Sequence, residues 1–92
     1  MKNITINGKE YKIKPIDFSA ICQLEELGLD VTNVGKQTFT TLRALASHTM
    51  GVDVEVAGRE IEKHLSNGGK IEDFRPLFNN LADSDFFRNI SQ

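Results

Sequence analysis

Few residues of this chain have side chains that could do chemistry, and they lie far apart. Its 92 residues include two histidines, His48 and His64, and a single cysteine, Cys22. Zinc sites use closely spaced groups of histidine and cysteine, which these three residues do not form. No nucleophile lies near a base in a recognisable catalytic motif. The chain is therefore predicted to be no enzyme, to hold no metal and to need no cofactor.

The segment Gly35-Lys36-Gln37-Thr38 is similar to the end of a phosphate-binding loop. That loop has the form G-x-x-x-x-G-K-[ST], in which backbone amides surround the phosphates and a hydroxyl holds magnesium. Here Asp30 occupies the position of the first glycine, and Gln37 occupies that of the hydroxyl residue. Nucleotide binding is therefore not expected at this segment.

The two histidines are better interpreted from their positions on predicted helices. We expect His48 to lie at the edge of the core with a hydrogen-bond partner. His64 lies near the end of a predicted helix that begins after Asp53, where a histidine complements the negative pole of the helix.

Residues 38–50 are predicted to form the helix on which the others pack. Its apolar residues recur every three or four positions, at Phe39, Leu42, Leu45, Ala46 and Met50. The remaining positions are small or weakly polar, so both flanks can carry neighbours without burying a charge. Only Arg43 has to reach water, and its long stem allows this.

The first sixteen residues predict a β-hairpin, because apolar and polar residues alternate on either side of Asn7-Gly8-Lys9-Glu10. A two-residue turn at Asn7-Gly8 would place Ile4 opposite Tyr11. A four-residue loop would instead place Ile6 opposite Tyr11 and Ile4 opposite Ile13, and we prefer it for its cleaner apolar pairs. Two strands alone are marginally stable, so the apolar face must pack on helices.

Three further helices are expected around the central one. The first runs from about Phe18 to Leu27, is capped by Asp17 and is stopped by Gly28. Its expected apolar positions are Phe18, Ile21, Cys22, Leu24 and Leu27. The second begins at Asp53 and ends at Asn67-Gly68-Gly69. The third ends near Ala82 and has Pro76 in its first turn, which favours Asp73 as its cap. A last turn follows from Asp83.

Composition and charge narrow the class of protein. Apolar residues make up 39% of the chain and charged residues 26%, as expected of one folded domain of this length. No leader and no apolar run of membrane-spanning length is present, and one cysteine suits a reducing compartment. We therefore expect a cytoplasmic protein without a membrane partner.

The charge is unevenly distributed along the chain. Residues 1–16 carry four lysines against one glutamate, a net charge of +3, whereas the rest of the chain sums to −5. We interpret the basic hairpin as a solvated or protected strand face rather than as a site for nucleic acid. The two helices joined by Gly51-Val52-Asp53 have the outline of a helix-turn-helix. However, three glutamates on the second of them disfavour contact with phosphates.

The order of these elements resembles a known family. Residues 1–31, MKNITINGKEYKIKPIDFSAICQLEELGLDV, are similar to the start of small tail assembly chaperones of long-tailed phages and prophages. In that family a hairpin of the form I-x-I-N-G-K-x-Y leads into a helix of the form F-x-A-I-x-x-L-E-E-L-G. Further similarities follow in LRALASHTMG, in HLSNGGKIEDF and in DSDFFRN. Pro76 departs from the smoother helix expected at that point.

The resemblance implies an α+β domain spanning residues 1–92, with the hairpin in 1–16 and the helical part in 17–92. It also implies a chaperone that binds the tape measure protein, aids assembly of the tail tube protein and is absent from the finished virion. A frameshifted longer form is often made in such families. Two alternatives stay open, a structural virion component such as a head-tail connector or tail completion protein, and a small DNA-binding regulator.

The last aromatic residues of the chain are our candidates for partner contact. Phe86, Phe87 and Ile90 follow the last expected helix and are numerous for the core of so small a protein. They could instead cap the open end of the core. The edge of the hairpin is a second candidate surface, and either surface could support a homo-oligomer.

Overall fold

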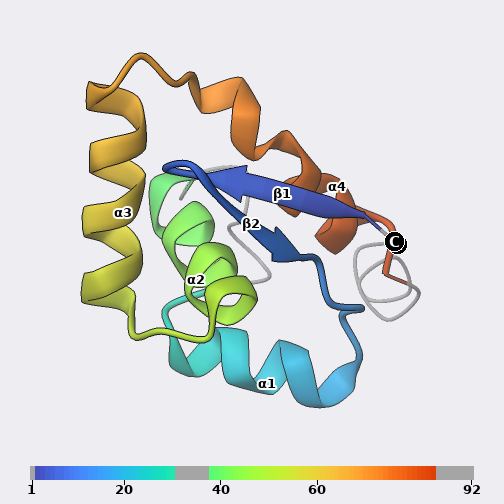
Figure 1. Cartoon of the computed structure of the whole chain (residues 1–92). Helices are drawn as coiled ribbons and strands as arrows, with labels where there is room; N and C mark the ends of the chain where they lie inside the picture. Colours follow the sequence, from blue (N-terminus) through green and yellow to red (C-terminus); the bar gives the residue numbers. More distant parts are fainter. Residues whose placement is uncertain (1, 31–37, 85–92) are drawn as a thin grey trace.

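The strands and helices of this protein pack around one helix, α2 (Thr38–Met50), as the sequence predicts (Figure 1). A computed structural model describes residues 2–30 and 38–84. Within these residues the chain forms an antiparallel hairpin followed by four α-helices and one short 3-10 helix. In chain order the elements are β1 (Asn3–Ile6), β2 (Lys9–Lys12), α1 (Phe18–Glu26), α2, α3 (Val54–Ser66), η1 (Ile71–Phe74) and α4 (Arg75–Ala82). The fold is α+β, as expected.

Small side chains allow α2 to be covered from several directions. Ala44 and Ala46 are fully buried, and the polar Thr41 and Ser47 are buried as well. The helices α1, α3 and α4 and the strand β2 all contact α2, and Figure 1 shows the hairpin crossing over it. Arg43 is exposed, as predicted. The burial predicted for Phe39 is wrong, because this residue lies in the first turn of α2 and is 73% exposed.

The hairpin uses the shorter of the two loops considered from the sequence. Ile4 lies opposite Tyr11 and Ile6 lies opposite Lys9, so the preferred four-residue loop is wrong. Asn7 and Gly8 have φ values of +51° and +83°, which is the left-handed pair of a type I′ turn. Asparagine and glycine adopt this conformation at low cost, and its twist matches that of the strands. The conformational preference of Asn7-Gly8 therefore determines the register of the hairpin, although the longer loop would pair more apolar residues with each other.

The first helix begins as predicted but buries a narrower face than expected. The Asp17 carboxylate accepts a hydrogen bond from the backbone N–H of Ala20 at 2.8 Å, which caps α1. Only Ala20, Ile21 and Leu24 are buried within the helix. The predicted burial of Phe18 and Cys22 is wrong, since both are exposed. These two residues are four positions apart and share an exposed face of α1.

The N-cap residue predicted for α3 is confirmed, whereas the one predicted for α4 is wrong. Asp53 caps α3 by accepting from the N–H of Val56 at 2.9 Å. Pro76 lies in the first turn of α4, as predicted, but Phe74 occupies the cap position. Asp73 instead lies within η1, because the chain makes a 3-10 turn before α4 begins.

The core lies between the inner face of the hairpin and the helices. Its most deeply buried residues include Ile6, Leu24, Ala57, Phe74 and Leu77. None of the helices in residues 2–30 and 38–84 is long and apolar enough to cross a bilayer. Of the last turn expected from Asp83, only Asp83 and Ser84 lie within the described residues.

Replacing Gly8 with valine should destabilise the protein by about 1–2 kcal/mol, the cost of a left-handed conformation for a residue with a Cβ atom. Space is not the cause, because no atom lies within 4 Å of a Cβ built at this position. Gly8→Asn should cost less, since asparagine tolerates this conformation. Urea unfolding of both variants would measure the difference, and equal stabilities would contradict the two-residue turn.

Candidate functional site

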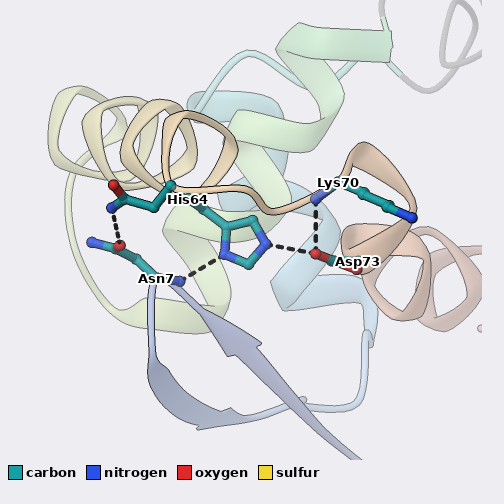
Figure 2. A network of polar contacts seen from close by, with 5 residues as sticks. Asn7, His64, Lys70 and Asp73 are labelled. Carbon is teal, nitrogen blue, oxygen red and sulfur yellow. Dashed lines mark hydrogen bonds and ion pairs between the residues drawn. The ribbon is translucent and has the colours of Figure 1, made fainter.

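A network of polar contacts in the described part of the chain includes the imidazole of His64, near the end of α3 (Figure 2). Its Nδ1 accepts a hydrogen bond from the backbone N–H of Asn7 at 2.8 Å. Its Nε2 lies 2.8 Å from Oδ2 of Asp73. Because Nδ1 is an acceptor, the neutral ring carries its proton on Nε2 and donates it to the Asp73 carboxylate. One side chain thus connects the hairpin turn, α3 and η1.

The Asn7 side chain adds a second connection between the turn and α3. Its Nδ2 donates to Oε2 of Glu60 at 2.9 Å, and its Oδ1 accepts from Nδ2 of Asn67 at 3.5 Å. The turn is therefore held at its backbone and at its side chain by residues of α3 and of its C-cap.

Asp73 holds the other side of the histidine and also orders the chain before α4. Its Oδ2 accepts from the backbone N–H of Lys70 at 2.9 Å as well as from His64. The Lys70 hydrogen bond, and then that of His64, lower the pKa of Asp73 below its usual value. The ring of His64 also packs against Phe74, with 5.0 Å between the ring centres.

Gly69 makes the close approach to His64 sterically feasible. A Cβ atom at position 69 would lie 2.3 Å from Cδ2 of the ring and 2.6 Å from the carbonyl oxygen of His64. Neither distance is compatible with a side chain, so only glycine fits here.

The arrangement around His64 superficially suggests an acid–base pair, because a carboxylate orients an imidazole. In catalytic triads, however, the second ring nitrogen receives a proton from a nucleophile. In this protein that nitrogen accepts from a backbone amide, which does not give up its proton. We therefore interpret the group of Asn7, His64 and Asp73 as a structural clamp. The helix-pole role predicted for His64 misses these partners, which are distant in sequence.

His48 differs from its predicted role. The residue is half-buried on α2, and its Nε2 is buried without a hydrogen-bond partner among the described residues. Burial lowers the pKa of His48 below 6.5, nearby Lys14 lowers it further, and Asp17 opposes the shift. The expected hydrogen bond is therefore not found at this nitrogen.

Large apolar side chains are exposed at three separate places on the described surface. Phe39 is 73% exposed on α2, Phe18 is 63% exposed on α1, and Ile71 is 44% exposed on η1. Phe39 borders a shallow groove between α2 and α3. The groove is lined by Phe39, Thr40, Leu42, Arg43, Gly58 and Ile61.

The contact residues predicted from the sequence, Phe86, Phe87 and Ile90, lie outside the described residues, so they stay a prediction. Sequence reasoning missed Phe39 as a surface residue, because its spacing places it with the apolar residues of α2. Gly58 is the residue in the sequence that could have indicated a surface groove here. It has no side chain, and it lies on α3 beside the part of α2 that carries Phe39.

Comparisons of the chain with protein-family models, with curated proteins and with solved structures found no match. Among residues 2–30 and 38–84, no three histidine, cysteine or acidic side chains are grouped as metal ligands would be. Inference about function therefore depends on the surface of the molecule and on its own residues.

Replacing His64 with leucine should destabilise the protein by about 1–3 kcal/mol, because the N–H of Asn7 loses its acceptor in a partly buried position. The change can be measured by urea unfolding. Lys63→Leu is the matched control, since Lys63 is an exposed neighbour on the same helix and its loss should change stability by less than about 0.5 kcal/mol. Equal effects of the two substitutions would argue against the clamp.

Stability should also fall as the pH is lowered from neutrality, in part because of His48. Its pKa is lower in the folded than in the unfolded protein, so the unfolded state takes up more protons below pH 6.5. The stabilisation is present above that pH and is lost as the pH falls towards the folded pKa. His48→Leu should therefore show a smaller loss between pH 7.5 and about pH 5 than the wild type. An unchanged slope in denaturant titrations would refute this assignment.

Proposed function

We propose that this protein is a phage or prophage tail assembly chaperone, which binds a long helical partner, the tape measure protein, during assembly of the tail tube. The order of the hairpin and helices in the sequence suggests this class. The observation that carries the proposal furthest is the exposure of Phe39 beside an apolar groove. Exposed aromatic residues that border a groove are typical of surfaces that bind other proteins.

A tail assembly chaperone must shield apolar segments of its partner and later release them. Such binding requires apolar contact area, but not the large interface of a permanent complex. The large apolar residues exposed on the described surface, Phe18, Phe39 and Ile71, lie on three different elements and would support a small contact area of this kind. The clamp at His64 also supports a role in binding rather than catalysis, since both ring nitrogens are used to hold the fold together.

Co-expression with the largest helical protein encoded just downstream should make that partner soluble, and the two proteins should elute together on size exclusion. Purified finished particles should lack this chain. Phe86→Asp combined with Phe87→Asp, with circular dichroism as the check on folding, would test the contact predicted from the sequence. Solubilisation that weakens in this variant would assign the contact to those residues.

Two results would overturn the proposal. Retention of the chain in finished particles, without solubilisation of the downstream protein, would identify a structural virion component. A salt-sensitive shift of DNA on a gel would identify a nucleic-acid-binding protein instead, because phosphate contacts weaken with ionic strength.

A further inference from the structure

We propose that the groove between α2 and α3 binds one amphipathic helix of the partner, and that this helix carries an acidic residue beside its apolar stripe. The inference rests on the proposed function and assigns its contact to Phe39, Arg43, Gly58 and Ile61. These residues differ from Phe86, Phe87 and Ile90, the contact predicted from the sequence.

Gly58 is the first observation that points to an external occupant. It lies in the middle of α3, where glycine is unfavourable because it has more conformational freedom to lose than any other residue. The packing of this chain does not require it. A Cβ atom at position 58 would meet only Cδ of Arg43, at an ordinary contact distance of 3.6 Å. The missing side chain instead leaves room for a second backbone to approach α3.

The residues around Gly58 supply the apolar contact for such a helix. Phe39 lines the groove, and its side chain is largely exposed to solvent. The half-buried Ile61 lines the same groove, and so does Leu42, which is only 2% exposed. An apolar stripe with a period of three to four residues would fit along these side chains, as in other complexes of a helix in a groove.

Arg43 indicates the charge of the occupant. It is the one charged residue among the groove-lining residues that the structure describes, so within residues 2–30 and 38–84 no acidic side chain lines the groove with it. Within residues 2–30 and 38–84, no acidic side chain pairs with Arg43. A carboxylate at the margin of the bound helix would therefore pair with its guanidinium.

The size of the groove favours a single helix over a second copy of this chain. Stable protein dimers use about 20–30 residues from each side. The groove has six lining residues among those described, far fewer than such an interface needs. One helix bound over these residues would form a small contact that can dissociate, as the proposed function requires.

The test uses the full-length chain and fluorescein-labelled peptides that cover the amphipathic helices of the downstream protein. Phe39→Asp should weaken binding of the best peptide by at least about tenfold, a change that corresponds to 1.4 kcal/mol. The matched control is Phe18→Asp, which changes a phenylalanine that is 63% exposed, against 73% for Phe39, and that lies outside the groove; it should leave affinity unchanged.

Gly58→Ala separates binding from folding. It should raise the melting temperature by about 4 °C, because alanine favours the helix. It should nevertheless weaken peptide binding, since its methyl group occupies the groove. Arg43→Glu should also weaken binding, and replacing the acidic residue of the peptide by arginine should restore it.

The outcomes distinguish this inference from the proposed function. Wild-type binding that Phe39→Asp and Gly58→Ala leave unchanged would overturn the groove as the contact, while the chaperone role would stand. A wild-type chain that neither binds a peptide nor copurifies with the downstream protein would overturn both. If Phe39→Asp only converted a dimer into a monomer in sedimentation, the occupant would be a second copy, and the inference would be wrong.

Discussion

The burial of α2 is the constraint on which the rest of this structure depends. A helix of thirteen residues can contact three other helices and a strand only if its own side chains are small where the neighbours approach. Ala44 and Ala46 are small enough for neighbouring elements to approach closely. The buried Thr41 and Ser47 are also small, so neighbours can approach the flanks of α2 as well. Larger side chains at these positions would separate the layers and expose the core, because protein interiors have little free volume.

The helix α3 is held in a different way from the other helices. Ala57 is its one fully buried residue, and its remaining apolar residues are half-buried. Besides its contact with α2, α3 is held by polar contacts near its C-terminal end, where His64 and Glu60 hold the hairpin turn and Asp73 holds His64. This arrangement leaves the side of α3 near Gly58 free of large packing demands, so a groove can exist there without loss of the core.

Much of the fold could be predicted from the sequence, because local signals agree with the final packing. The spacing of apolar residues gives the bounds of α2, and Asp17 and Asp53 are caps that act on their own neighbouring amides. The failures have nonlocal or competing causes. In the hairpin, the pairing of apolar side chains favours the longer loop, whereas the turn conformation of Asn7 and Gly8 favours the shorter one. The turn conformation sets the observed register.

The surface was harder to predict than the fold. Periodicity shows which residues share a helix face but not which of them a neighbouring element covers, so it does not reveal the exposure of Phe39 in the first turn of α2. The partners of His64 were missed for a similar reason, since Asn7 is 57 positions away in the chain. The end of the chain, which holds Phe86, Phe87 and Ile90, lies outside the described residues, and its role stays a prediction.

The clamp between Asn7 and His64 also has a consequence for how the protein is made. The hairpin precedes α3 in the chain and is therefore synthesised before it, yet the side chains that fix its turn belong to α3 and its C-cap. Contacts between residues so distant in sequence form slowly, because a long segment must be closed into a loop first. We therefore expect the turn to reach its final position only after α3 has formed, and until then the apolar residues of the inner face of the hairpin lack part of the core that covers them.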